Sequence, residues 1–202
     1  AEAQRFLADA GPGAALWVMG DIGSGRRTFI ESVAEEATRR GGRVIPLAGD
    51  DDAFRRLVWL LRDTRGELDV ENADADPSTA SPTAGTVTEL IELLCMQASF
   101  TKRAILLAAP SFWSHTGATQ VAILEVITGC GQRGAPVLLV AGIDPATTPA
   151  YSHAIRVDLR PLSGAEVSSV AAHWIGVSGI PPELAPRLLR ASEGLPGPLT
   201  AL

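Results

Sequence analysis

Short apolar runs alternate along the chain with segments whose apolar residues recur at helical spacing. The run from Ala14 to Gly20 is bounded by glycines and predicts a buried strand. The segment from Thr28 to Arg40 has helical periodicity and stops at a glycine pair, which predicts a helix. The same signals predict further strands at 43–48, 103–109, 136–142 and 154–159, and helices after 50–52, at 87–100 and at about 118–129. This alternation predicts an α/β fold in which helices flank a parallel sheet on both faces.

Beyond residue 160 the pattern is purely helical, with predicted helices at 163–175 and 182–192 and the start of a third. Ser163 and Glu166 have the spacing of a capping box at the first of these helices. The chain therefore divides into an α/β core and a small helical lid, predicted over residues 1–160 and 161–202.

One internal segment, residues 67–85, is acidic and rich in alanine, serine, threonine and proline. Such a segment cannot bury enough apolar area to offset its ordering entropy, so we expect a mobile loop. The chain begins with Ala1 rather than methionine and ends in a helical pattern. We therefore expect a segment of a longer protein, with the lid truncated at its C-terminus.

The composition is that of an ordinary globular protein, with a formal net charge of −6 that disfavours a nucleic-acid-binding surface. No apolar run approaches the ~20 residues of a membrane-spanning helix, so no membrane association is expected. Cys95 and Cys130 lie in apolar segments, which indicates buried reduced thiols and a cytoplasmic location. The three histidines lack metal-ligand spacing. Trp17, Trp59 and Trp174 fall in strand and helix patterns and are expected in the core or at its edge.

A glycine-rich loop, Gly20 to Thr28, joins the first predicted strand to the first predicted helix. This is the position of a Walker A loop, G-x-x-x-x-G-K-S/T, which holds phosphate with its backbone N–H groups and the helix N-terminus. The glycines are present, but Arg26 stands at the lysine position and Arg27 at that of the Mg²⁺-binding hydroxyl, and the only lysine of the chain is Lys102. Thr28 comes one residue late, which turns a helical side chain by about 100°. Either the arginines hold a phosphate, which guanidinium groups bind well, or the loop binds nothing.

With this loop the chain resembles the AAA+/STAND ATPase domains of bacterial signalling regulators, over nearly its whole length. In that family the third strand ends in two acidic residues, followed soon by a tryptophan. The matching stretch here runs from Ile105 to Trp113 and has Ala109 and Pro110 in place of the two carboxylates. In the family these carboxylates hold Mg²⁺ through water and polarise the attacking water, which alanine and proline cannot do.

Other positions bear on the same resemblance. The family commonly has a polar or basic sensor after the fourth strand, where this chain has Asp144, which would repel a γ-phosphate or else cap a turn. The nearest polar candidates, His115 and Glu125, are expected on the surface of a loop or helix. Glu193 to Pro196 resembles the G-x-P element of STAND proteins, whose proline approaches the nucleotide base; a simple helix stop and restart is the alternative.

The predicted site consists of nucleotide-binding candidates only, with no catalytic and no metal-binding residue. These candidates are Gly20, Gly23, Ser24, Gly25, Arg26, Arg27, Thr28 and Pro196. The combined losses imply a P-loop NTPase-like domain that keeps the fold and lacks efficient hydrolysis. We expect a regulatory or scaffolding module in signalling that binds protein partners or other domains of its own polypeptide, without a cofactor. The alternatives are a switch that binds ATP or ADP with little hydrolysis and a weak ATPase completed in trans by a partner.

Overall fold

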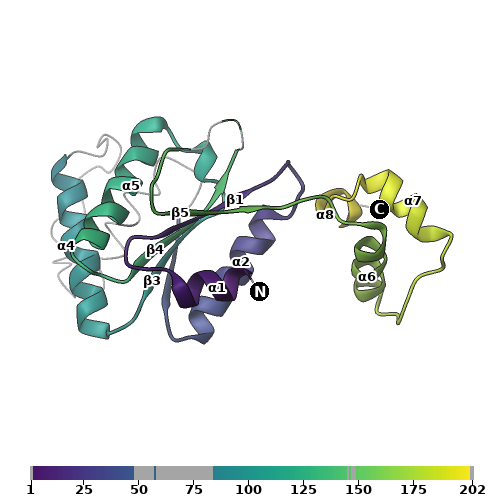
Figure 1. The fold of residues 1–202 in the computed structure, drawn as a ribbon, viewed down its shortest axis with the longest axis horizontal. Helices are drawn as coiled ribbons and strands as arrows, with labels where there is room; N and C mark the ends of the chain where they lie inside the picture. The colour runs from purple at the N-terminus through teal and green to yellow at the C-terminus, as the bar shows by residue number, and fades with distance from the viewer. Residues whose placement is uncertain (1, 48–56, 58–83, 145, 147–148, 201–202) are drawn as a thin grey trace, which may run out of the picture.

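The computed structural model describes residues 2–47, 57, 84–144, 146 and 149–200. Within these residues one sheet of five parallel strands has the order β2-β3-β4-β1-β5 (Figure 1). The strands are β1 (Ala15–Met19), β2 (Arg43–Pro46), β3 (Ile105–Ala109), β4 (Val137–Ile143) and β5 (Ala154–Asp158). The parallel sheet predicted from the sequence is confirmed. Because the strands are parallel, the carboxyl ends of β1, β3 and β4 meet at one edge of the sheet.

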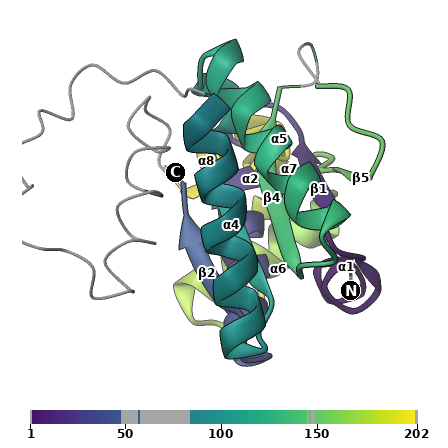
Figure 2. The ribbon, with the colours of Figure 1, turned by 90° about the vertical axis from the view of Figure 1, so that its left-hand side faces the viewer.

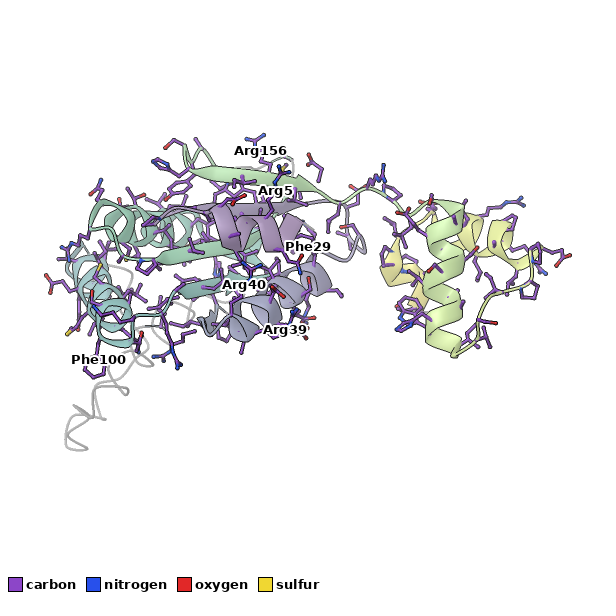
Figure 3. All side chains as sticks on the ribbon, turned by 60° about the horizontal axis from the view of Figure 1, so that its bottom comes forward. Arg5, Phe29, Arg39, Arg40, Phe100 and Arg156 are labelled. Carbon is purple, nitrogen blue, oxygen red and sulfur yellow. The ribbon has the colours of Figure 1, made fainter. Side chains whose placement is uncertain are left out.

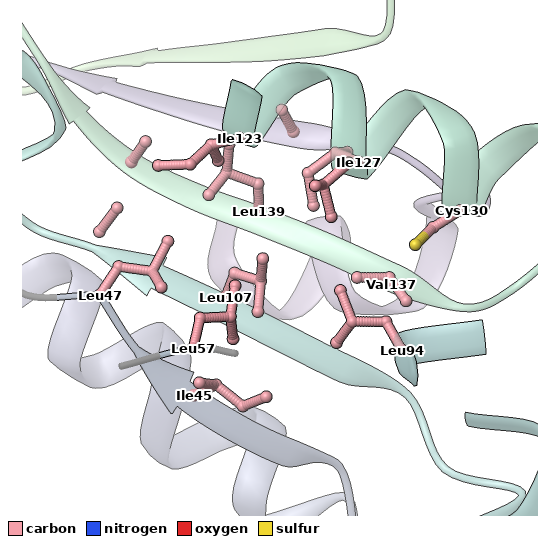
Figure 4. Packing of buried hydrophobic residues seen from close by; sticks show 14 of the residues in the cluster. Ile45, Leu47, Leu57, Leu94, Leu107, Ile123, Ile127, Cys130, Val137 and Leu139 are labelled. Carbon is pink, nitrogen blue, oxygen red and sulfur yellow. The ribbon is translucent and has the colours of Figure 1, made fainter. Parts of the chain in front are cut away.

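One face of the sheet is covered by α4 (Ala84–Thr101) and α5 (Gly117–Gln132), which lie side by side in front of the strands in Figure 2. The sheet side chains that point to this face join a single buried apolar cluster with both helices. Figure 4 shows the middle of this cluster, where Leu139 of β4 lies beside Ile123 and Ile127 of α5. Cys130 of α5 is buried in it, Cys95 of α4 is half-buried, and both are free thiols.

The opposite face is covered by α1 (Glu2–Asp9) and α2 (Arg26–Arg39). Leu16 and Val18 of β1 point to this face, whereas Trp17 between them points to the other, as the period of two in a strand requires. Every residue of β1 is therefore buried. This explains why the strand reads as a continuous apolar run, typical of a sheet covered on both sides.

Three helices follow β5 and stand at one end of the sheet: α6 (Gly164–Ile175), α7 (Leu184–Ser192) and α8 (Pro196–Thr200) (Figure 1). The capping box predicted at the first of them is present. The Ser163 hydroxyl accepts from the Glu166 N–H at 3.4 Å, and the Glu166 carboxylate accepts from the Ser163 N–H at 2.7 Å. No helix within the described part of the chain is long and apolar enough to cross a membrane.

Two elements differ from the prediction. Helix α1 was not predicted, because it is only two turns long and Phe6 is its one fully buried anchor, which is too short a pattern to show a period. Helix α4 begins at Ala84, so the last two residues of the predicted loop 67–85 are helical. The rest of that loop and the helix predicted after 50–52 lie outside the described residues, apart from Leu57, which is buried.

Candidate functional site

The glycine-rich loop joins β1 to α2 at the edge where the strands end. The backbone φ angles of Gly23 and Gly25 are both 88°, in the left-handed region that a residue with a Cβ rarely adopts. The Ser24 N–H donates to the Asp21 carbonyl at 3.0 Å, which closes the turn. Gly25 is the N-cap of α2 and offers no side chain to its first N–H groups. The backbone of the loop therefore requires glycine at positions 23 and 25.

The two arginines of the loop point to different surroundings. Arg26 is half-buried, and its Nη1 donates to the carbonyl of Ile143, the last residue of β4, at 2.9 Å. This bond holds the side chain along the end of the sheet. Arg27 is exposed, and its Nε pairs with the Glu31 carboxylate one turn along α2 at 2.9 Å. Arg27 thus offers a mobile guanidinium, because an exposed pair of this kind contributes little free energy.

A cavity of about 780 Å³ opens beside the loop, between the carboxyl edge of the sheet and helices α6 and α8. Its volume is in the range of small-ligand sites. All the candidate residues predicted from the sequence line it except Gly20. The structure therefore brings the lid residue Pro196 to the loop residues across about 170 positions of sequence, a separation no local pattern could bridge.

Helix α8 is in direct contact with the loop. The Gly197 N–H donates to the Gly23 carbonyl at 2.9 Å, and a Cβ built on Gly197 would lie 2.9 Å from the Gly23 Cα. Pro196 packs beside Gly25, where a Cβ would meet its ring at 3.6 Å. A further hydrogen bond, from the Leu162 N–H to the Gly194 carbonyl at 2.7 Å, joins the segment before α6 to the turn before α8. This close contact needs glycine at 197, a requirement that the sequence analysis did not detect.

Among the described residues that line the cavity, none carries a carboxylate. Ala109 ends β3 fully buried, and Pro110 follows it at the cavity wall. The Asp144 carboxylate accepts from the Ala146 N–H at 2.9 Å, so it caps a turn, which was one of its two predicted roles. The described wall of the cavity consequently offers hydroxyls, backbone N–H groups and guanidinium groups to a ligand, and no acidic group for a metal or a proton.

The segment after β3 contains one wrong prediction. A short 3-10 helix, η3 (Phe112–Ser114), turns the chain so that the His115 N–H donates to the Phe112 carbonyl at 3.2 Å. His115 is therefore buried, with its ring edge-on to Phe112, rather than at the surface, whereas Glu125 is exposed as predicted. The turn instead sends Trp113 outward, 46% exposed, to the cavity.

Trp174 of α6 also lines the cavity and is 48% exposed, while Trp17 is buried in the core. Helical periodicity placed Trp174 in or at the edge of the core. Its actual surroundings depend on how α6 sits against the sheet, which no local pattern reports. Two half-exposed tryptophans, Trp113 and Trp174, thus line the cavity and are not among the candidate residues.

The chain was compared with known protein families, curated proteins and solved structures. No protein-family model and no curated protein matches the chain. Among solved structures, AMPPCP-bound DnaA from Aquifex aeolicus aligns with a TM-score of 0.56 and 15% identity, over 99% of this chain and 58% of that one. A STAND protein with a tetratricopeptide repeat sensor from Pyrococcus horikoshii aligns with a TM-score of 0.56 and 13% identity, over 96% and 28%. Drosophila ORC bound to DNA aligns with a TM-score of 0.53 and 15% identity, over 93% and 46%.

The chain has an AAA+/STAND-type P-loop ATPase fold. The AAA+ resemblance inferred from the glycine loop, the third strand and the lid is confirmed at the level of the fold. Identities this low establish no activity. The chain also spans less than two thirds of the length of each of these structures. What the AAA+ fold does here therefore rests on the residues of the site.

Proposed function

We propose that this domain is a regulatory AAA+/STAND-like module that has lost efficient ATP hydrolysis and acts through protein partners or other domains of its polypeptide. One observation carries the proposal: among the described residues, the wall of the cavity beside the phosphate loop contains no carboxylate. P-loop ATPases use a hydroxyl and a carboxylate to hold Mg²⁺, together with a group that orients the attacking water. Ala109 and Pro110 stand where the AAA+ resemblance expects the two carboxylates.

The arginines do not replace these groups. Arg26 is held against the Ile143 carbonyl, and Arg27 stands at the hydroxyl position with its guanidinium exposed. A guanidinium can neutralise phosphate charge, but it neither binds Mg²⁺ nor removes a proton from water. Positioning and charge stabilisation by metal and arginine supply most of the acceleration of phosphoryl transfer, so hydrolysis here should be slower by several powers of ten.

The test is steady-state phosphate release from Mg²⁺·ATP by the wild type and by the double variant Arg26→Lys, Arg27→Thr. This variant restores the side chains of the consensus loop and leaves the strand end unchanged. We expect no turnover above background from either protein, because neither has carboxylates at the end of β3. Turnover by the wild type would contradict the proposal. Turnover by the double variant alone would show that the loop, rather than the strand end, limits hydrolysis.

A second candidate function is a nucleotide-controlled switch. It is favoured by the cavity of about 780 Å³ and by the direct contact between the lid and the phosphate loop at Gly197. A ligand on the loop could change that contact and so bias the lid. DnaA from Aquifex aeolicus, which has a similar fold, binds AMPPCP in its solved structure. A weak ATPase completed in trans is the remaining alternative, and it predicts turnover per molecule that rises with protein concentration.

A further inference from the structure

We infer that the free edge of β5 pairs with β5 of a second copy of this chain, antiparallel and about a two-fold axis at Val157. The pairing continues the sheet from one copy into the other and places Arg156 of each copy opposite Asp158 of the other. Neither of these two residues lines the cavity beside the phosphate loop, so the pairing does not depend on the proposed loss of hydrolysis. Three features of β5 support it: its unpaired backbone, the order of its charges and the space beside Ile155.

The backbone of β5 is hydrogen-bonded on one side only within the described residues. Strand β5 is the last in the sheet order β2-β3-β4-β1-β5 and pairs in parallel with β1. The His153 carbonyl accepts from the Ala15 N–H at 3.1 Å. The Leu159 N–H donates to the Met19 carbonyl at 2.8 Å. Because successive residues of a strand turn their backbone groups to opposite sides, the odd-numbered residues from 153 to 159 face β1. The N–H and C=O groups that face the free edge are those of Ala154, Arg156 and Asp158.

This free edge can accept another strand. Figure 3 shows Arg156 on β5 at the outer margin of the core, and both Arg156 and Asp158 are exposed. Unpaired backbone groups in a row at a sheet edge are a template for a further strand, unless a proline or a bulge interrupts them. The residues of β5 include no proline, and their register with β1 is unbroken. The edge is therefore regular enough to pair over its whole length.

The order of the charges selects one register. Residues that face the free edge lie opposite one another when two such edges pair antiparallel. A two-fold axis at Arg156 or at Asp158 would place that residue opposite its own copy, and like charges directly opposite destabilise a strand pair. An axis nearer the start of β5 leaves both charges without a charged residue opposite. An axis at Val157 forms the Arg156–Asp158 pair twice. Within the described part of a single copy neither side chain forms an ion pair, so both are available.

The other face of the same register is apolar. Ile155, Val157 and Leu159 point to the α1 side of the sheet, where Val157 and Leu159 pack in the core. The axis at Val157 places Ile155 opposite Leu159 of the second copy. Ile155 is 46% exposed and lines a cavity of about 320 Å³ between α1 and β5. An apolar side chain brought beside Ile155 from the second copy would cover this exposed surface, which favours a second β5 over a polar peptide.

The experiment is sedimentation equilibrium of the 202-residue chain over a concentration series. The paired edge is short, so we expect a weak dimer that forms as the concentration rises to millimolar. Arg156→Asp and Asp158→Arg each place like charges opposite at both pairs, and each should weaken the dimer by about 10- to 100-fold. The double variant Arg156→Asp, Asp158→Arg exchanges the charges and should dimerise as the wild type does. The matched control is Arg187→Asp, the same change at an exposed arginine of α7, which should leave the dimer unchanged.

A mixture of the two single variants tests the register itself. Arg156→Asp has two acidic residues on the edge, and Asp158→Arg has two basic ones. Each variant alone repels its own copy, whereas a mixed dimer has opposite charges at both pairs. The mixture should therefore dimerise at concentrations at which each variant alone is monomeric. Mixed dimers no tighter than those of the separate variants would overturn the inference.

Hydrogen exchange locates the contact on the strand. The amides of Arg156 and Asp158 should exchange slowly only at concentrations at which the dimer forms. The amides of Ile155 and Val157, which face β1, should be protected at every concentration. A chain that stays monomeric up to millimolar concentration would overturn the inference. So would a dimer that neither charge reversal weakens, or one that leaves the exchange of Arg156 and Asp158 unchanged.

Discussion

Replacing Gly197 with alanine tests the seating of the lid on the phosphate loop. The added Cβ would lie 2.9 Å from the Gly23 Cα and 3.2 Å from its carbonyl oxygen, which are backbone atoms and cannot move aside as a side-chain tip can. Overpacking of this kind costs about 1–3 kcal/mol, and the Gly197 N–H to Gly23 carbonyl bond contributes about 1 kcal/mol. The lid can avoid the clash by detaching, so the sheet should keep its stability while α8 leaves the loop.

The measurement is hydrogen exchange of the amides of the loop and of α8. A loss of about 1–3 kcal/mol from the closed state predicts exchange about 5- to 150-fold faster at Gly197, with strands β1 and β4 unchanged. The matched control is Gly179→Ala, a glycine of the connection between α6 and α7 whose added Cβ meets nothing within 4 Å. Wild-type exchange of the loop and α8 in Gly197→Ala would refute the proposed role of this contact.

Three further changes probe the packing of β4, the hydrogen bond of the Tyr151 hydroxyl and the ion pairs at the end of α2. Gly142→Ala in β4 should lower the free energy of unfolding by about 3 kcal/mol in urea titration, because its Cβ would overlap the Pro110 carbonyl. Gly117→Ala, with open space around it, should have little effect. Equal stability of the two variants would contradict the close packing of β4 against Pro110. Tyr151→Phe should lose about 1 kcal/mol, because the Tyr151 hydroxyl donates to the Gly13 carbonyl at 2.6 Å; an unchanged urea midpoint would contradict it. The hydrogen bond from Arg40, helped by the nearby Arg39, holds the pKa of the Glu36 carboxyl below its usual value. The ionised Glu36 carboxylate therefore stabilises the fold above its unfolded pKa, and this contribution is lost as the pH falls through the folded pKa. The free energy of unfolding of Glu36→Gln should fall less steeply in acid than that of the wild type.

The sequence predicted the fold well because each strand and most helices carry their own local signal. Strand β1 is buried on both faces and has an unbroken apolar sequence. The capping box of Ser163 and Glu166 predicts the start of α6. The order of the strands has no such signal, since it depends on which strands pair across the sheet. The insertion of β4 between β1 and β3 is visible only in the structure.

The sequence predicted the part of the candidate site that is contiguous in the chain, and missed the residues that only the fold brings to it. The loop residues are contiguous and follow a spacing set by phosphate chemistry, so the sequence located them. Trp113 and Trp174 meet at one cavity only because α8 sits on the loop, and Gly197 is required only because Gly23 lies against it. His115 carries an ordinary polar side chain, and its burial depends on the short helix η3, which the hydrophobic pattern does not predict.

The loss of hydrolysis is the central claim, and single-turnover release of phosphate from bound ATP tests it most directly. The protein is held in excess over ATP, with and without Mg²⁺, beside an Arg26→Ala control that removes the guanidinium at the lysine position. The account predicts that phosphate is released in every sample no faster than in a solution without protein. Mg²⁺-dependent phosphate release that Arg26→Ala abolishes would contradict it and make this domain an ATPase.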